Sequence, residues 1–283
     1  MDRFATPAPA EIGIDVARAL AEDLGSGDVT ASLLADVPER GYVIAKEPAV
    51  IAGRPWFDAC FESLDPAVRI HWRVSEGEHI AAQTVVCTFE GRARALVSAE
   101  RCSLNFLQTL SGTATRTAEF VAAVAGTGAR ILDTRKTLPG LRLAQKYAVR
   151  VGGGVNHRIG LFDAVMLKEN HVLAAGSIAA AAATARASYP ELPLIIEVES
   201  IDELEQALAV DCTRILIDDF SLADMREAVR RAAGRTPLEV SGSVSLETVR
   251  EIAGTGVDFI SVGALTKNVR AADFSMRLGL PPG

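Results

Sequence analysis

Short runs of apolar, largely β-branched residues alternate with amphipathic segments along the second half of the chain. Segments with helical spacing lie between the runs at Ile201–Val210, Ser221–Ala233 and Ser245–Ala253, and Ser221 and Ser245 stand where N-caps are expected. Buried parallel strands have this appearance, because both of their faces are covered. The pattern therefore predicts six successive βα units, whose strands are Arg130–Asp133, Ala164–Lys168, Leu194–Glu197, Arg214–Asp218, Leu238–Val240 and Asp258–Val262.

These βα units favour a barrel over a dinucleotide-binding sheet. Such a sheet carries a Gly-x-Gly-x-x-Gly turn directly after its first strand. The glycines at 152–154 do not follow a strand, so they are a weak signal for a dinucleotide.

The first hundred residues have a different pattern and predict a smaller α+β domain. Glycines and prolines separate the short strands expected there. A helix is expected from about Ser98, with Leu104, Leu107 and Leu110 on one face and an end near Ser111-Gly112. The expected strands are Val43–Ala45, Val50–Ala52, Val68–Trp72 and Thr84–Phe89.

Composition and charge narrow the class of protein. The 283 residues are 49% hydrophobic and 23% charged, with a formal net charge of −7, which argues against nucleic acid as a partner. The most apolar stretch, Val172–Ala185, is shorter than the roughly 20 residues of a membrane span. Because Met1–Phe4 also lacks the apolar start of a secretory signal, we expect a cytoplasmic enzyme without a membrane partner.

Cations are concentrated between residues 135 and 168 of this acidic chain. Only Asp163 opposes them, so the local balance is +6 with His157 neutral. Two like charges about 6 Å apart repel by roughly 2–3 kcal/mol at an effective dielectric constant near 20. A shared pocket for these groups therefore predicts a strongly anionic small molecule as ligand. The basic residues are Arg135, Lys136, Arg142, Lys146, Arg150, Arg158 and Lys168.

Polar or small residues stand at nearly every predicted strand end. In a barrel, the carboxyl ends of the strands face the site that the βα loops build. Glu197 and Asp218 offer oxygen ligands for Mg²⁺ or acceptors for ribose hydroxyls, and the loops at Ser241-Gly242 and Gly263 are suited to phosphate. We therefore expect an anion receptor, carboxylates and a phosphate loop on one rim.

At these residues the chain resembles the quinolinate phosphoribosyltransferase family almost from end to end. Asp133-Thr-Arg-Lys-Thr-Leu-Pro-Gly-Leu-Arg142 and Gly152-Gly-Gly-Val-Asn-His-Arg158 carry the most specific part of the resemblance. The other matching motifs are Glu22–Gly25, Gly27–Thr30, Glu100–Gln108, Leu110–Gly112, Lys146–Val149, Lys168–His171, Ile196–Glu199 and Val257–Ala264.

The resemblance implies a fold and a reaction. The expected fold is an incomplete, open α/β barrel of about six parallel strands at 113–267, with an N-terminal α/β sandwich domain at 1–112 joined by 268–283. The expected reaction joins quinolinate to phosphoribosyl pyrophosphate (PRPP) with Mg²⁺, giving nicotinate mononucleotide, pyrophosphate and CO₂ in NAD synthesis. The resemblance also implies a homodimer or higher homo-oligomer.

The resemblance further assigns the site. Arg135, His157, Arg158 and Lys168 would surround quinolinate, and Arg101 would come from the neighbouring subunit. The remaining residues would bind PRPP: Lys136 as a cation, Glu197 and Asp218 at the ribose and metal, and Ser241, Gly242, Ser243 and Gly263 at the 5-phosphate. Catalytic roles would fall to Lys136, Lys168, Glu197 and Asp218.

Three positions depart from the family pattern. Asp219 stands where the family usually has Asn, Ser243 replaces a Gly, and Leu138 replaces a Thr. The first adds negative charge near the carboxylates, and the second changes the phosphate loop. None of the three lies among the residues assigned to the quinolinate receptor.

Other interpretations stay open at this point. Either Glu197 or Glu199 could be the ligand, since both share one face of a strand end. The four-residue spacing of Arg142, Lys146 and Arg150 is typical of a solvated helix face. Alternative functions are a barrel aldolase that forms a Schiff base on Lys168, a pyrophosphorylase-like relative associated with molybdenum transport, and a non-catalytic anion sensor.

Overall fold

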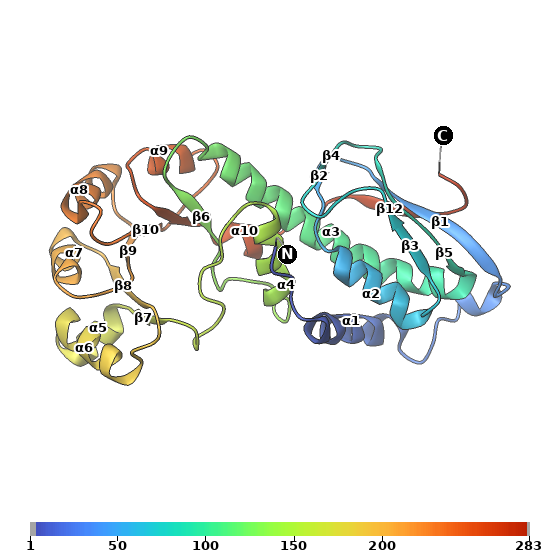
Figure 1. Ribbon diagram of the computed structural model, residues 1–283, viewed down its shortest axis with the longest axis horizontal. Coiled ribbons are helices and arrows are strands. Elements are labelled where there is room, and N and C mark those ends of the chain that lie inside the picture. The colour runs from blue at the N-terminus through green and yellow to red at the C-terminus, as the bar shows by residue number, and fades with distance from the viewer. Residues whose placement is uncertain (1–3, 282–283) are drawn as a thin grey trace. The chain divides into compact units, whose positions relative to one another are not determined.

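The computed structural model describes residues 4–281 and divides into two compact units. The first unit comprises residues 1–118, 138–153 and 268–283, and the second, here called the barrel unit, comprises 119–137 and 154–267 (Figure 1). Residues 1–3 and 282–283 lie outside the described part. They belong to the predicted domain ranges, and residues 1–3 to the segment used to predict the absence of a secretory signal. The domain bounds drawn from the sequence stay a prediction.

The barrel unit is built on one parallel sheet of six strands in the order β6-β11-β10-β9-β8-β7. Because β6 and β7 form its two edges, the sheet is an open barrel, and the predicted fold class is confirmed. All six predicted strands are present, within one residue at each end. They are β6 (Arg130–Leu132), β7 (Val165–Leu167), β8 (Leu194–Val198), β9 (Arg214–Asp218), β10 (Leu238–Ser241) and β11 (Phe259–Ser261).

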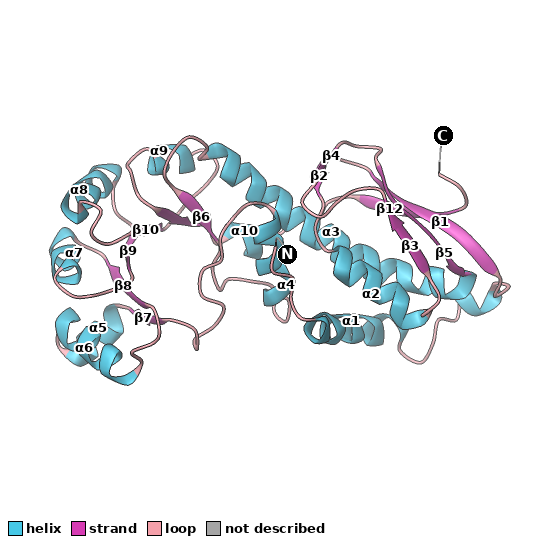
Figure 2. Cartoon of the chain, viewed as in Figure 1, coloured by secondary structure: helices cyan, strands magenta, loops and turns pink. Residues whose placement is uncertain are grey.

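Helices follow the strands, and α6 to α9 lie on the outside of the curved sheet (Figure 1, Figure 2). The predicted N-cap Ser221 is confirmed, since its hydroxyl accepts the N–H of Asp224. The prediction that Ser245 is also an N-cap is wrong, because α9 starts only at Val249. The Ser245 N–H instead donates to the hydroxyl of Thr248. The helices are α5 (Glu169–Ala175), α6 (Ile178–Ser188), α7 (Ile201–Leu208), α8 (Leu222–Ala232), α9 (Val249–Ala253) and α10 (Ala264–Lys267).

The first unit contains an antiparallel sheet in the order β12-β1-β5-β3 and a separate pair, β2-β4. Strand β12 comes from the far end of the chain and pairs with β1, from Gly41 opposite Leu278 to Ala45 opposite Phe274. The strands are β1 (Pro38–Ala45), β2 (Ala49–Val50), β3 (Arg69–Trp72), β4 (His79–Ile80), β5 (Val85–Arg92) and β12 (Phe274–Leu278). The helices are α1 (Pro9–Leu24), the 3₁₀ turn Ala31–Leu33, α2 (Arg54–Leu64), α3 (Ala93–Ala123) and α4 (Arg142–Val151).

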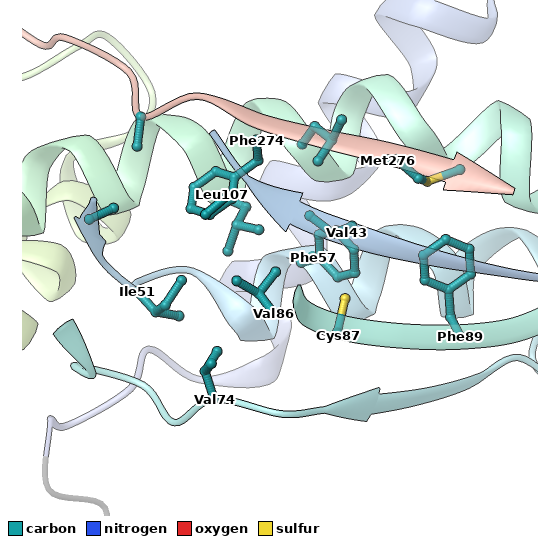
Figure 3. Packing of buried hydrophobic residues seen from close by; sticks show 14 of the residues in the cluster. Val43, Ile51, Phe57, Val74, Val86, Cys87, Phe89, Leu107, Phe274 and Met276 are labelled. Carbon is teal, nitrogen blue, oxygen red and sulfur yellow. The ribbon is translucent and has the colours of Figure 1, made fainter. Parts of the chain in front are cut away.

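One apolar cluster joins this sheet to α2 and α3. Figure 3 shows Phe274 and Met276 of β12 in one cluster with Val43 of β1, Phe57 of α2 and Leu107 of α3. Each of the five is at most 7% exposed. Since burying a large apolar side chain contributes about 1.5–3 kcal/mol, β12 is held by its side chains as well as by its ladder.

Helix α3 corrects the expected end near Ser111-Gly112, because it continues as one helix to Ala123. A Cβ at Gly112 would lie 2.1 Å from the carbonyl oxygen of Arg270, so this glycine allows close packing and does not end the helix. Among residues 4–281, neither α3 nor any other helix is both long and apolar enough to cross a membrane.

Helix α4 corrects a second expectation, the solvated face of Arg142, Lys146 and Arg150. Lys146 is 1% exposed, and Arg150 donates to the carbonyl oxygens of Phe4 and Ala5. The spacing of charges identifies which residues share a helix face, but it does not determine whether that face meets water or protein.

Replacing Gly112 by Ala should destabilise the first unit. The added methyl group would strike a backbone carbonyl, and overpacking of this kind costs about 1–3 kcal/mol of unfolding free energy. The control is Gly13→Ala in α1, where a Cβ meets nothing within 4 Å and the gain in helix propensity should be about 0.5–1 kcal/mol. Urea unfolding measures both, and equal effects of the two substitutions would contradict the packing role of Gly112.

Candidate active site

The carboxyl ends of the six parallel strands bring most of the predicted site residues to one edge of the barrel unit. Lys168 follows β7, and Glu197 and Asp218 lie on β8 and β9. Ser241 closes β10 in register with Asp218, and Gly263 lies just beyond β11. The edge therefore collects cations, carboxylates and small residues, as expected for a barrel.

Arg135 and Arg158 form the cationic side of this edge. Burial and then the nearby charge of Arg135 lower the pKa of the Arg158 guanidinium. That guanidinium donates to the carbonyl oxygen of Ala164 at 3.3 Å and is half-buried. Two cations held within each other's field favour the binding of an anion between or beside them.

Two aspartates hold the loop that carries Arg158, here called the receptor loop (residues 156–163). Asp133, fully buried at the end of β6, accepts the His157 N–H at 2.8 Å and the Asn156 side-chain amide at 2.6 Å. Asp163 accepts the N–H groups of Ile159 and Gly160 at 2.7 and 2.9 Å. The loop is thus tied to the sheet on one side of Arg158 and to itself on the other.

His157 lies inside the barrel unit, 8% exposed, with both ring nitrogens against protein groups. Its Nδ1 accepts the N–H of Arg158 at 2.6 Å. Its Nε2 lies 3.3 Å from a carboxylate oxygen of Glu239, a fully buried residue of β10. The structure therefore places the His157 side chain between the main chain of Arg158 and the carboxylate of Glu239.

The acidic side of the edge contains Glu197, Glu199 and Asp218, whose carboxylate oxygens lie within 4.8 Å of one another. Although Glu199 is exposed, loss of hydration and the neighbouring Glu169 raise its pKa. Lys168 joins this cluster to the cationic side, because its Nζ lies 2.5 Å from Oε2 of Glu197. A set of oxygen ligands at this spacing fits a hard divalent cation such as Mg²⁺.

Two glycines line the remaining part of the edge. A Cβ at Gly263 would lie 3.2 Å from Cδ of Lys136, so the lysine side chain runs along this loop. A Cβ at Gly242 would lie 2.9 Å from Oδ1 of Asp219, and both residues have positive φ, +134° and +53°. The structure thus places Asp219, a departure from the family pattern, against the expected phosphate loop.

Two predicted residues are not brought into these contacts. Ser243 is exposed in the loop after β10, and Arg101 is exposed on α3 in the first unit. Sequence reasoning missed Asp133 and Glu239 as site residues. A signal for Glu239 was present, because it is a lone carboxylate in the apolar run Leu238-Glu-Val240.

The two parts of the chain match the two domain models of one family. The chain matches the model for the N-terminal domain of quinolinate phosphoribosyl transferase over residues 28–111 and that for its C-terminal domain over residues 113–277. The chain belongs to the quinolinate phosphoribosyltransferase family.

Individual relatives agree along most of their length. The nicotinate-nucleotide pyrophosphorylase [carboxylating] of Mycobacterium leprae is 45% identical over 274 residues, covering 93% of this chain and 95% of that protein. A probable counterpart from Synechocystis is 43% identical, over 92% and 90%. The solved nicotinate-nucleotide pyrophosphorylase of Francisella tularensis is 41% identical, with a TM-score of 0.96 over 99% of this chain and all of that one.

Replacing Asp133 by Ala should loosen the receptor loop. Two donors would lose their buried acceptor, which costs about 1–3 kcal/mol of unfolding free energy. The control is Asp211→Ala, since the Asp211 side chain is 95% exposed and surface changes stay within about 0.5 kcal/mol. Thermal and urea unfolding measure both, and a neutral Asp133→Ala would show that the loop is held elsewhere.

Proposed function

We propose that this chain transfers the phosphoribosyl group of PRPP to quinolinate and releases nicotinate mononucleotide, pyrophosphate and CO₂. Membership of the family and relatives of 40–45% identity with this named activity support the proposal. The observation that carries it is the coupled pair Arg135 and Arg158 beside an acidic cluster on one barrel edge.

Quinolinate would bind on the cationic side. Its two neighbouring carboxylates suit the planar forks of Arg135 and Arg158, and Lys168 would add a third cation. Burial and the field of Arg135 lower the pKa of Arg158, and the charge of a bound dianion would offset this effect. His157 would support this receptor from inside the barrel.

PRPP would bind across the acidic side and the glycine loops. Glu197 and Asp218, with Glu199 close by, would hold Mg²⁺ and the ribose hydroxyls, and the metal would neutralise charge on the pyrophosphate when bound. The side chain of Lys136, which runs along the Gly263 loop, would face the pyrophosphate. Ser241, Gly242, Ser243 and Gly263 would receive the 5-phosphate.

The chemistry needs positioning and charge more than acid–base groups. The pyridine nitrogen attacks the anomeric carbon as the bond to pyrophosphate breaks, and Lys136 stabilises the departing oxygens. Alkylation leaves a positive ring nitrogen, which stabilises the electron pair left at C2 when CO₂ departs. A proton from solvent then completes nicotinate mononucleotide.

The assembly and location follow as further parts of the proposal. Arg101 would be supplied by a second copy of the chain, so the active form would be a homodimer or a higher homo-oligomer. The enzyme would work in the cytoplasm. Sedimentation of the purified protein tests the assembly.

The environment of Lys168 separates this proposal from the aldolase alternative. Schiff-base lysines are activated in apolar pockets or by a neighbouring cation, whereas the Nζ of Lys168 is held by Glu197 at 2.5 Å. The comparisons favour the proposed function over a relative associated with molybdenum transport, because the similar proteins above are named nicotinate-nucleotide pyrophosphorylases.

The direct test supplies the purified chain with quinolinate, PRPP and Mg²⁺. Equal amounts of pyrophosphate and CO₂ are expected, and both should fall when the metal is chelated. The proposal would be rejected if the chain formed no product with quinolinate but released pyrophosphate, without CO₂, when nicotinate replaced quinolinate. Binding of quinolinate without turnover would favour the anion sensor.

Replacing Arg135 by Lys should lower kcat/KM for quinolinate by about 10- to 100-fold. The charge stays, but the planar fork and one charge-assisted hydrogen bond of about 1.5–3 kcal/mol are lost. Arg186→Lys on α6, whose guanidinium donates to the Asp211 carbonyl, is the matched control and should be neutral. Steady-state kinetics decide, and near-normal turnover of Arg135→Lys would remove this residue from the receptor.

Replacing Asp219 by Asn should lower KM for PRPP about two- to fivefold. The exposed carboxylate repels a phosphate in the Gly242 loop by about 0.5–1 kcal/mol in water, and the effect should shrink at high salt. Asn tolerates the positive φ of this position, so the backbone is kept. Asp211→Asn controls for net charge, and an unchanged KM would show that Asp219 does not act on the phosphate.

A further inference from the structure

A buried carboxylate stands at the centre of a polar network inside the barrel unit. Oε2 of Glu239 lies 2.8 Å from Nη1 of Arg214 on β9 and 3.3 Å from Nε2 of His157. Its other oxygen accepts the hydroxyl of Ser261 on β11. Glu239 is 0% exposed, and Arg214 also lies over the ring of Phe259 at 4.6 Å. Three neighbouring strands and the receptor loop therefore meet at one carboxylate.

One hydrogen bond and one contact of His157 define the tautomer of its neutral ring. Nδ1 accepts the N–H of Arg158, so it carries a lone pair and no proton. The ring proton of the neutral imidazole then lies on Nε2, which faces Glu239. A carboxylate opposite Nε2 favours this same tautomer. The imidazole thus joins a carboxylate in the sheet to the main chain of Arg158.

The contacts of Glu239 favour the ionised form of its carboxyl group. Burial alone raises the pKa of a carboxyl, but the contacts with His157, Ser261 and Arg214 bring the pKa of Glu239 below its ordinary value. A buried carboxylate that accepts from Arg214 and Ser261 and lies 3.3 Å from Nε2 of His157 is costly to disturb, because loss of one of these groups leaves charge uncompensated. Glu239 therefore holds the receptor loop rigidly against the sheet.

We propose that Glu239 is a positioning residue that acts through His157 to fix the main chain of Arg158, and that His157 acts on the substrate through Arg158 and not by direct contact. The inference rests on the proposed function only for the identity of the substrate. Arg158 is then held at its N–H by His157, at its guanidinium by the Ala164 carbonyl, and by the Asp163 turn that follows it. The network sets the geometry of the quinolinate receptor and leaves the PRPP side untouched.

The first test is Glu239→Gln, which keeps the shape of the side chain. Its amide oxygen can take the place of Oε2 opposite Arg214 and His157, and its NH2 can donate to the Ser261 hydroxyl, so the substitution removes the negative charge that faces Nε2 of His157. KM for quinolinate should rise about tenfold, as for the loss of one hydrogen bond, with KM for PRPP changed less than twofold. Glu251→Gln on α9 is the exposed control for the loss of one charge and should be neutral. Equal changes in both KM values, or none, would overturn the proposal.

The second test reads the tautomer without activity. In protein labelled with ¹⁵N-histidine, nitrogen chemical shifts should identify His157 as the Nε2–H form, and Glu239→Gln should change them. An Nδ1–H form or an imidazolium in the unsubstituted protein would overturn the proposal. This measurement stands even if the substituted protein does not fold. An unsubstituted protein that makes no nicotinate mononucleotide would reject the proposed function, while the tautomer would still test the network.

The third test uses two replacements of His157. The side-chain oxygen of Asn can take the place of Nδ1 and accept the Arg158 N–H, whereas the amide of Gln reaches the place of Nε2 and leaves that N–H without its acceptor. The proposal predicts that KM for quinolinate is about tenfold higher in His157→Gln than in His157→Asn. Equal KM values, or the reverse order, would indicate direct contact and overturn it.

Discussion

Two fully buried carboxylates, Asp133 and Glu239, hold the loop that carries Arg158 to the barrel sheet. A buried charge costs several kcal/mol unless donors surround it. Here the donors are the main chain and side chain of the 156–157 turn, Arg214 and Ser261. Because each carboxylate depends on groups from the loop, the loop cannot move without leaving a charge unsatisfied. This mutual dependence makes the edge of the barrel a fixed surface.

A fixed surface allows like charges to stay close. Burial and the neighbouring charge of Arg135 both lower the pKa of Arg158, and mobile loops would let the two cations separate. On the other side of the edge, Glu197, Glu199 and Asp218 crowd their carboxylates together. The Lys168–Glu197 ion pair lies between the two groups and partly offsets both. Charges arranged in advance for an anion on one side and a cation on the other are the usual basis of electrostatic catalysis.

The apolar pattern was sufficient to predict all six barrel strands, because strand burial on both faces leaves a direct trace in the sequence. Features that depend on contacts between distant segments were not accessible in this way. Gly112 suggests a helix end in the sequence, but in the structure it allows the close approach of the Arg270 carbonyl. Lys146 is buried because other parts of the protein pack against α4, which its spacing does not show. Polar residues at strand ends indicated Lys168, Glu197 and Asp218, whereas the partners of Glu239 on two other strands became visible only in three dimensions.

The pairing of β12 with β1 also bears on how the chain is made. Every other strand of that sheet lies before residue 93, while β12 begins at Phe274. At about 5–20 residues per second, a ribosome needs on the order of ten to fifty seconds to go from β1 to β12. During that time one edge of β1 has no partner, and unpaired edges invite pairing with other chains. The whole barrel unit is synthesised within this interval, so it can fold before the first sheet is complete.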